Sequence, residues 1–144
     1  MGIEGDSPQE RDRLKAKDAS RGLLAIFFVI AGAGHFVKPT TYLKIMPPYA
    51  PAPLLMIYIS GIFEILLGLL VIPPKTRKLA GWGLIALLIA VFPVNIHLAL
   101  HPEIFPDVPV WVDWIRLPLQ GLFIFWVYQA ALEQKKRGLV PQGF

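Results

Sequence analysis

Apolar residues along the chain are gathered into four long runs, separated by short polar segments. The runs cover residues 19–37, 54–72, 79–100 and 114–132. A helix rises 1.5 Å per residue, so runs of this length form helices of about 30 Å, which matches the hydrocarbon core of a bilayer. The alternating pattern of a membrane β-barrel does not occur. The pattern predicts an all-α, polytopic membrane protein, a bundle of four transmembrane helices.

Composition agrees with this fold class. The chain has 144 residues, of which 55% are hydrophobic and 17% are charged, whereas an ordinary soluble domain is about 25% charged. Outside a membrane domain of 19–132, only a polar tail (1–18) and a basic tail (133–144) remain, which is too little for a soluble catalytic domain. The chain has no Cys, which excludes disulfides, thiolate metal sites and cysteine nucleophiles.

The basic residues predict the orientation. Eleven of the 14 Lys and Arg residues lie before or at the very start of the first run, between the second and third, or after the fourth, and only Lys38 and Lys44 lie in the other two connections. The positive-inside rule therefore places both termini in the cytoplasm, with the protein multi-pass in the cell (plasma or inner) membrane. Orientation also accounts for the net charge of +4, so the bilayer, and not nucleic acid, is the expected partner.

The first run also fits a second interpretation. Arg21, the apolar stretch 23–30 and Ala31-Gly32-Ala33 have the order of a cleaved signal peptide. We expect the segment to be retained as a helix, because it continues apolar to Val37 and four helices pack better than three.

The connection 38–53 is rich in proline, with aromatic and aliphatic residues between the prolines. Proline fixes φ and biases the preceding residue toward extended conformations, so we expect a stiff loop. Two interpretations stay open: a rigid connector with an aromatic anchor such as Tyr42, or a lid over a site.

Six of the polar residues within the runs are candidates for a functional site, because such groups are costly in lipid and often functional. They are His35, Glu64, Asn95, His97, Arg116 and Gln120. Measured from the predicted span ends, Glu64 is deepest, at about 15 Å, and the others are closer to the outer surface. The polar residues come from all four helices, whereas the cytoplasmic half is apolar. This distribution predicts a polar pocket that opens outward.

Helix periodicity refines this prediction. Ser60, Gly61, Glu64 and Gly68 share one face, whose small residues allow close approach of another helix, so Glu64 should point into the bundle. Asn95 and His97 are about 200° apart, so both cannot face inward on an ideal helix. Pro93 frees the carbonyl of residue 89 and favours a kink, and we expect Asn95 to bond to that carbonyl.

The chemistry of these groups leaves alternatives open. In one interpretation, Glu64 and Arg116 form a buried ion pair that fixes the order of the helices. In the other, Glu64 is a proton-handling carboxylate and Arg116 binds an anionic or carbonyl group of a ligand. His97 and His101 have the i, i+4 spacing of metal ligands on a helix. Pro102 disfavours helical geometry at His101, so we predict no metal site and regard this pair as a weak candidate.

Four short motifs follow one another in this chain: GHF at 34–36, SGIFEIL at 60–66, NIH at 95–97 and RLPLQ at 116–120. In this order they resemble the DoxX-like family of membrane proteins, and the resemblance covers about residues 21–128. It implies a four-helix bundle. Relatives in the superfamily include oxidoreductase subunits linked to thiosulfate:quinone oxidation, and also assembly factors. The six polar residues of this chain match polar positions of the family, but the resemblance assigns no catalytic role to any of them.

The leading hypothesis is therefore a redox-associated, DoxX-like protein that binds a lipophilic ligand such as a quinone in the outer half of the bundle. Glu64, His35 and His97 would handle protons, and Arg116, Gln120 and Asn95 would bind the ligand. If the protein is an enzyme, it is an oxidoreductase or a subunit of one. No residue of the chain carries electrons, so the electrons must come from a quinone, a metal, a bound cofactor or a partner subunit. The alternative is a non-catalytic scaffold, assembly factor or subunit of a larger membrane complex, with a homo-oligomer or protein partner. A carrier for a small solute is a third idea.

Overall fold

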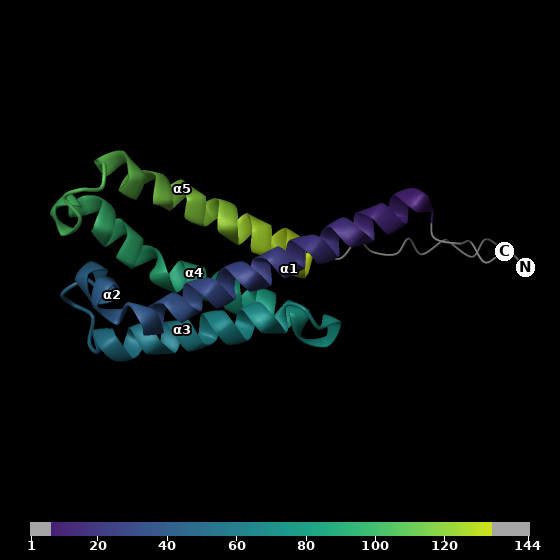
Figure 1. Cartoon of the computed structure of the whole chain (residues 1–144), viewed down its shortest axis with the longest axis horizontal. Coiled ribbons are helices and arrows are strands. Elements are labelled where there is room, and N and C mark those ends of the chain that lie inside the picture. Colours follow the sequence, from purple (N-terminus) through teal and green to yellow (C-terminus); the bar gives the residue numbers. More distant parts are fainter. Residues whose placement is uncertain (1–6, 134–144) are drawn as a thin grey trace, which may run out of the picture.

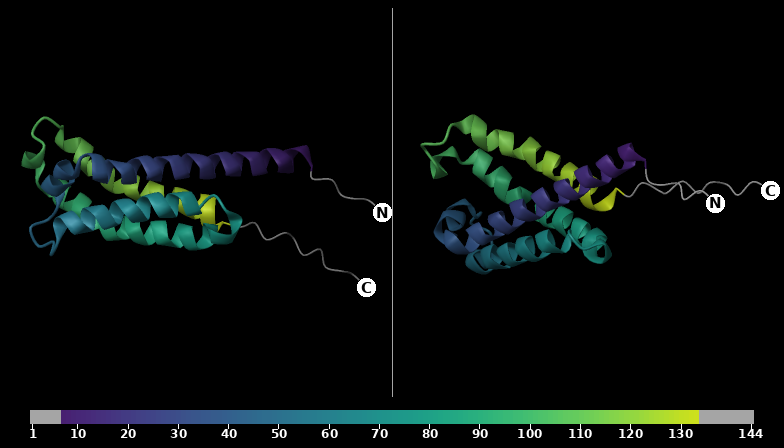
Figure 2. Two further views of the ribbon diagram at one scale, coloured as in Figure 1. Left: turned by 60° about the horizontal axis from the view of Figure 1, so that its bottom comes forward. Right: turned by 45° about the vertical axis from the view of Figure 1, so that its right-hand side comes forward.

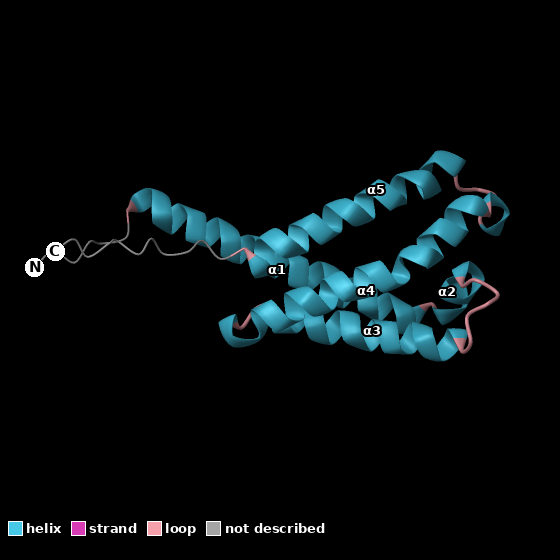
Figure 3. Cartoon of the chain, turned by 180° about the vertical axis from the view of Figure 1, so that it is seen from behind, coloured by secondary structure: helices cyan, strands magenta, loops and turns pink. Residues whose placement is uncertain are grey.

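The computed structural model describes residues 7–133, and this part of the chain is helical with short connections (Figure 1). The four long helices are α1 (Pro8–Val37), α3 (Pro53–Leu70), α4 (Pro74–Leu100) and α5 (Val110–Val127). The remaining elements are α2 (Pro39–Ile45), the 3-10 turn η1 (Pro102–Ile104) and the π-helical turn η2 (Tyr128–Leu132), which continues α5. Between residues 7 and 133 there is no strand (Figure 3).

The prediction of an all-α membrane protein is confirmed at this level. Each long helix, with η2 counted as part of α5, is long and apolar enough to cross a membrane. The order of the four helices follows the four apolar runs. The basic cluster at 135–137, on which part of the predicted orientation depends, lies outside the described residues.

Helix α1 begins much earlier than residue 19, the start expected from hydropathy. Ser7 caps it by accepting a hydrogen bond from the Glu10 backbone N–H at 3.2 Å, and Pro8 occupies the first turn. Ser and Pro at these positions are typical of a helix start. With 30 residues, α1 is about 45 Å long. Its first turns therefore project beyond the other helices (Figures 1 and 2).

The connection 38–53 contains a helix that the sequence analysis did not predict. Pro39 begins α2, at a position where a missing N–H costs no hydrogen bond. The residues after α2 form the expected irregular, proline-rich link to α3. The same use of proline recurs at Pro53 and Pro74, which begin α3 and α4.

The helices pack as two pairs, α1 on α3 and α4 on α5, and α3 and α4 join the pairs. Figure 2 shows the pairs from two further sides. We call the end that holds the α3–α4 turn and η2 the terminal half of the bundle. The opposite end, which holds α2 and η1, is the loop half.

The apolar core lies in the terminal half. Its fully buried members include Leu24 of α1, Leu84 of α4 and Val127 of α5, packed with small residues such as Ala131. Many large apolar side chains point away from the bundle, among them Leu122, which is 60% exposed. An outer surface of this kind is suited to contact with lipid tails.

Candidate functional site

A cavity of about 410 Å³ lies in the loop half, between the two helix pairs and beneath α2. Most of its wall is apolar, with side chains such as Phe28, Ile57 and Phe123. The polar side chains in the wall come from α1, α2, α3, α4 and α5, and are His35, Tyr42, Ser60, Glu64, Asn95, Arg116 and Gln120. Five of the six polar residues singled out from the sequence therefore line one cavity. The exception is His97.

His35 and Glu64 form a nearly enclosed polar pair in the cavity wall. His35 Nε2 lies 3.5 Å from Glu64 Oε2, and both side chains are nearly enclosed. The other ring nitrogen, Nδ1, lies 2.9 Å from the carbonyl oxygen of Ile57. Because a carbonyl oxygen only accepts, Nδ1 carries a hydrogen, and Nε2 is left to face the carboxyl group. Between residues 7 and 133, Glu64 Oε2 is buried without a hydrogen-bond partner.

This geometry restricts what the pair can do. With Nδ1 already protonated, one further proton shared by the two side chains sits either on Glu64, as a neutral acid, or on His35, as a charged pair. The distance of 3.5 Å is longer than a good hydrogen bond, so transfer requires a small approach of the two groups or a bridging molecule. A group in the cavity that offers a donor or acceptor at Glu64 Oε2 would complete the pair.

A close approach of two helices brings these residues together. A Cβ added at Gly32 would lie 2.6 Å from the carbonyl oxygen of Gly61, and one added at Gly61 would lie 2.9 Å from that of Gly32. Only glycine permits backbones this close. The prediction that the face of α3 containing Gly61 and Glu64 allows close packing and turns Glu64 inward is confirmed, and the neighbour is α1.

Helix α2 covers the cavity with an aromatic side chain. The Tyr42 ring stacks on the His35 ring, with centroids 4.2 Å apart, and Ile45 and Met46 extend the cover. Burial raises the pKa of the Tyr42 hydroxyl, and the Glu64 carboxylate raises it further. Tyr42 thus remains a neutral phenol at physiological pH. This placement supports the lid interpretation over that of an interfacial anchor.

The opposite wall of the cavity contains two linked amides. Asn95 Nδ2 donates to Gln120 Oε1 at 2.6 Å, and Gln120 Nε2 donates to the carbonyl oxygen of Leu88. The expectation that Asn95 bonds to the carbonyl freed by Pro93 is wrong, because Asn95 bonds instead to the Gln120 side chain from α5. Each amide NH₂ has a second hydrogen that these contacts leave for a ligand.

Arg116 lines the cavity but does not pair with Glu64. Its Nε lies 4.0 Å from Oδ1 of Asp113, one helical turn earlier on α5, and its side chain is 43% exposed. An ion pair between Glu64 and Arg116, the structural one of the two interpretations of these residues, is absent from the described part of the chain. The Arg116 guanidinium therefore keeps most of its donors for other partners.

Asp113 precedes the apolar run 114–132, but it lies in the first turn of α5 and is only 1% exposed. Neither carboxylate oxygen has a hydrogen-bond partner within residues 7–133. The i, i+3 spacing between Asp113 and Arg116 could have predicted their pairing. Hydropathy placed the start of the span at residue 114, so Asp113 was not considered part of the helix.

His97 and His101 lie apart from the cavity. Their rings are 4.2 Å apart, and the ring nitrogen His101 Nδ1 is 2.8 Å from the His97 carbonyl oxygen. In residues 7–133 no group of three or more His, Asp or Glu side chains is arranged to hold a metal. Asn95 and His97 point to different sides of α4, and of the two only Asn95 lines the cavity.

Comparisons with known proteins give a family but no function. A family model described as a domain of unknown function (DUF8561) matches residues 24–131. The chain belongs to this family. No curated protein and no solved structure matches it. The matched region runs from α1 to η2 and so includes every polar residue of the cavity wall.

Proposed function

We propose that the loop-half cavity binds a lipophilic molecule with a polar head, and that the protein is a redox-associated, DoxX-like membrane protein with a quinone as the representative ligand. The observation that carries the proposal is the His35–Glu64 pair, with an unpartnered carboxylate oxygen, in the wall of a largely apolar cavity of about 410 Å³. Cavities of this size and character are typical of small-molecule sites.

Each polar group has a role in this proposal. The His35–Glu64 pair holds a proton next to a ligand carbonyl, because Nε2 and the carboxyl group share one proton. Arg116 and the Asn95–Gln120 amides supply donors for carbonyl or anionic oxygens on the other wall. His97, the third proton-handling candidate, lies outside the cavity wall and has no part in this site.

A quinone takes up protons on its two oxygens when it is reduced. The described side chains can supply donors and a proton, but not electrons, because no Cys is present. The electrons therefore come from another ligand or from a partner subunit. We place both termini in the cytoplasm of a cell (plasma or inner) membrane, on the strength of the basic residues flanking the spans.

The test is equilibrium binding of decylubiquinone to the purified chain in lipid nanodiscs. Glu64→Gln preserves the shape but removes the titratable group, and Arg116→Ala removes the opposite donor. We expect each variant to weaken binding about tenfold or more, equivalent to loss of one charged hydrogen bond. Equal affinity in wild type and both variants, or no binding to wild type, would overturn the proposal.

The scaffold function remains the second candidate, and one feature favours it. The polar side chains of the cavity also tie helices together: His35 bonds to the backbone of α3, and Gln120 of α5 bonds to the backbone of α4. If this is their whole purpose, joint replacement of His35 and Glu64 by Leu should be tolerated in both stability and function. A stable double variant that has lost function would exclude the scaffold interpretation.

A further inference from the structure

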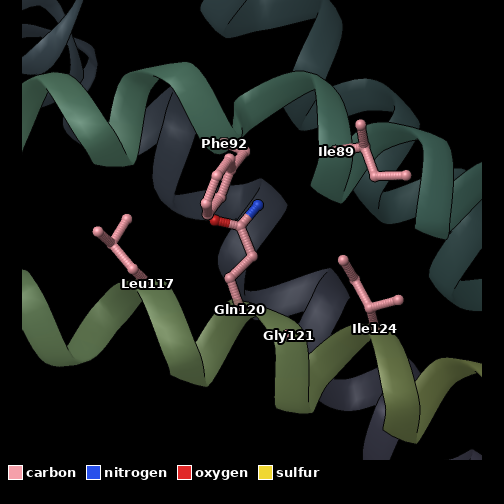
Figure 4. Close-up of a pocket in the computed structure, with 6 residues that line it drawn as sticks. All are labelled: Ile89, Phe92, Leu117, Gln120, Gly121 and Ile124. Carbon is pink, nitrogen blue, oxygen red and sulfur yellow. The ribbon is translucent and has the colours of Figure 1, made fainter.

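A second, smaller cavity lies directly behind the amide wall of the site. It has a volume of about 280 Å³ and forms a groove between α4 and α5 (Figure 4). Its lining is apolar except for one residue: Ile89 and Phe92 from α4, and Leu117, Gln120, Gly121 and Ile124 from α5. Ile89 is 59% exposed, so the groove opens on the surface that faces lipid.

Gln120 lines both this groove and the larger cavity. Its side chain points from α5 toward α4 and lies beside Phe92 (Figure 4). The hydrogen bonds of Gln120 to Asn95 and to the Leu88 carbonyl hold it in that position. The amide therefore separates the larger cavity inside the bundle from an apolar groove that opens toward the bilayer.

The groove owes its depth to a glycine. A Cβ added at Gly121 would meet no described atom within 4 Å, so no packing requirement accounts for glycine here. In this respect Gly121 differs from Gly32 and Gly61, where backbone contact requires the small residue. A larger side chain at 121 would occupy the groove itself.

From this arrangement we infer that the ligand is an amphiphile with one apolar tail, whose head lies in the loop-half cavity and whose tail leaves past Gln120 along the α4–α5 groove. The inference rests on the proposed function and adds the class of ligand and its path. The head replaces the Asn95–Gln120 bond with bonds of its own, and the Gln120 amide turns aside for the tail. Pro93 in α4 and Pro118 in α5 each remove a backbone hydrogen bond near this seam, which favours such movement.

The experiment compares two glycines and two probes. Gly121→Leu fills the groove, whereas Gly22→Leu adds the same side chain in α1 at another position where a Cβ meets no described atom. Leu is a better helix former than Gly, so both variants should fold, which circular dichroism and size-exclusion chromatography check. The probes are decylubiquinone and its tail-less parent, 2,3-dimethoxy-5-methyl-1,4-benzoquinone.

We expect Gly121→Leu to weaken decylubiquinone binding about tenfold relative to Gly22→Leu, because the tail loses its buried surface. The tail-less probe should bind both variants equally. If both probes bind and neither distinguishes the variants, the tail path is wrong while the proposed function stands. If neither probe binds the wild type, the proposed function fails and the tail path with it.

Discussion

The two halves of the bundle are built differently. The terminal half is packed with apolar side chains, such as Leu24, Leu84 and Val127, that are almost completely buried. The loop half contains the cavity, the buried carboxylates Glu64 and Asp113, and the polar amides. One half of the same four helices therefore resembles the interior of a stable protein, and the other resembles a binding site.

The helix ends of the terminal half are also held by side chains. Arg77 donates to the carbonyl oxygens of Val71 and Ile72 at 3.0 and 2.8 Å, and Arg21 donates to that of Ala130 at 2.8 Å. Cations at helix C-termini satisfy carbonyls that have no helical partner. In the loop half, prolines interrupt the hydrogen bonding of α4 and α5 instead. The side chains that hold these helix ends therefore lie apart from those that line the cavity.

The largest expected effect is on stability, in the terminal half. Leu84→Ala should lower the free energy of unfolding by about 2–5 kcal/mol, because it opens a cavity in the core. Leu122→Ala is the matched control, since the same truncation on the lipid-facing surface should cost little. Unfolding in SDS followed by circular dichroism measures both, and decylubiquinone affinity of the folded fraction should be unchanged. Equal costs for the two variants would contradict the division into halves.

An intermediate effect is expected at the contact between α1 and α3. Gly61→Val places a Cβ 2.9 Å from the Gly32 backbone oxygen and from the His35 Cβ. The helices must separate, at a cost of about 1–3 kcal/mol of stability. His35 then moves from Glu64, so ligand binding should fall as well, unlike in Leu84→Ala.

Gly22→Val is the control for this variant, because a side chain at residue 22 meets open space. Should Gly61→Val bind decylubiquinone as tightly as Gly22→Val does, the close approach of α1 and α3 would not position the site.

The smallest effect is expected at Asp113. Asp113→Asn keeps the shape of a side chain whose oxygens have no hydrogen-bond partner, and a neutral amide costs less to bury than a carboxylate. Stability should therefore change by less than about 1 kcal/mol, in the stabilising direction. Decylubiquinone affinity should change only a few-fold, through Arg116. A loss as large as that of Glu64→Gln would place Asp113 within the site.

Much of the fold follows from hydropathy, because lipid requires long apolar helices. The helix boundaries follow from hydropathy less closely. Hydropathy missed the first turns of α1, although Ser7-Pro8-Gln9-Glu10 has the form of a helix cap followed by Glu at the third position. It also missed α2, whose proline-rich surroundings suggested extended backbone.

The sequence could predict which residues belong to the candidate site, but not which of their side chains contact one another. Helix periodicity predicted that Glu64 points into the bundle. Whether its side chain contacts His35 or Arg116 depends on which helices are neighbours. The Gly32–Gly61 contact decides this, since it brings α1 against α3. Likewise, helical spacing shows that Asn95 and His97 point in different directions, but only the placement of α5 and Gln120 selects Asn95.

The most direct test of the central claim is to locate the ligand by photolabelling with an azido derivative of decylubiquinone in nanodiscs, followed by mass spectrometry. We expect labels on the cavity walls of the loop half, around Tyr42, Glu64 and Gln120, that excess decylubiquinone competes away. Labels spread over the outer surface, or confined to the terminal half and not competed, would contradict it.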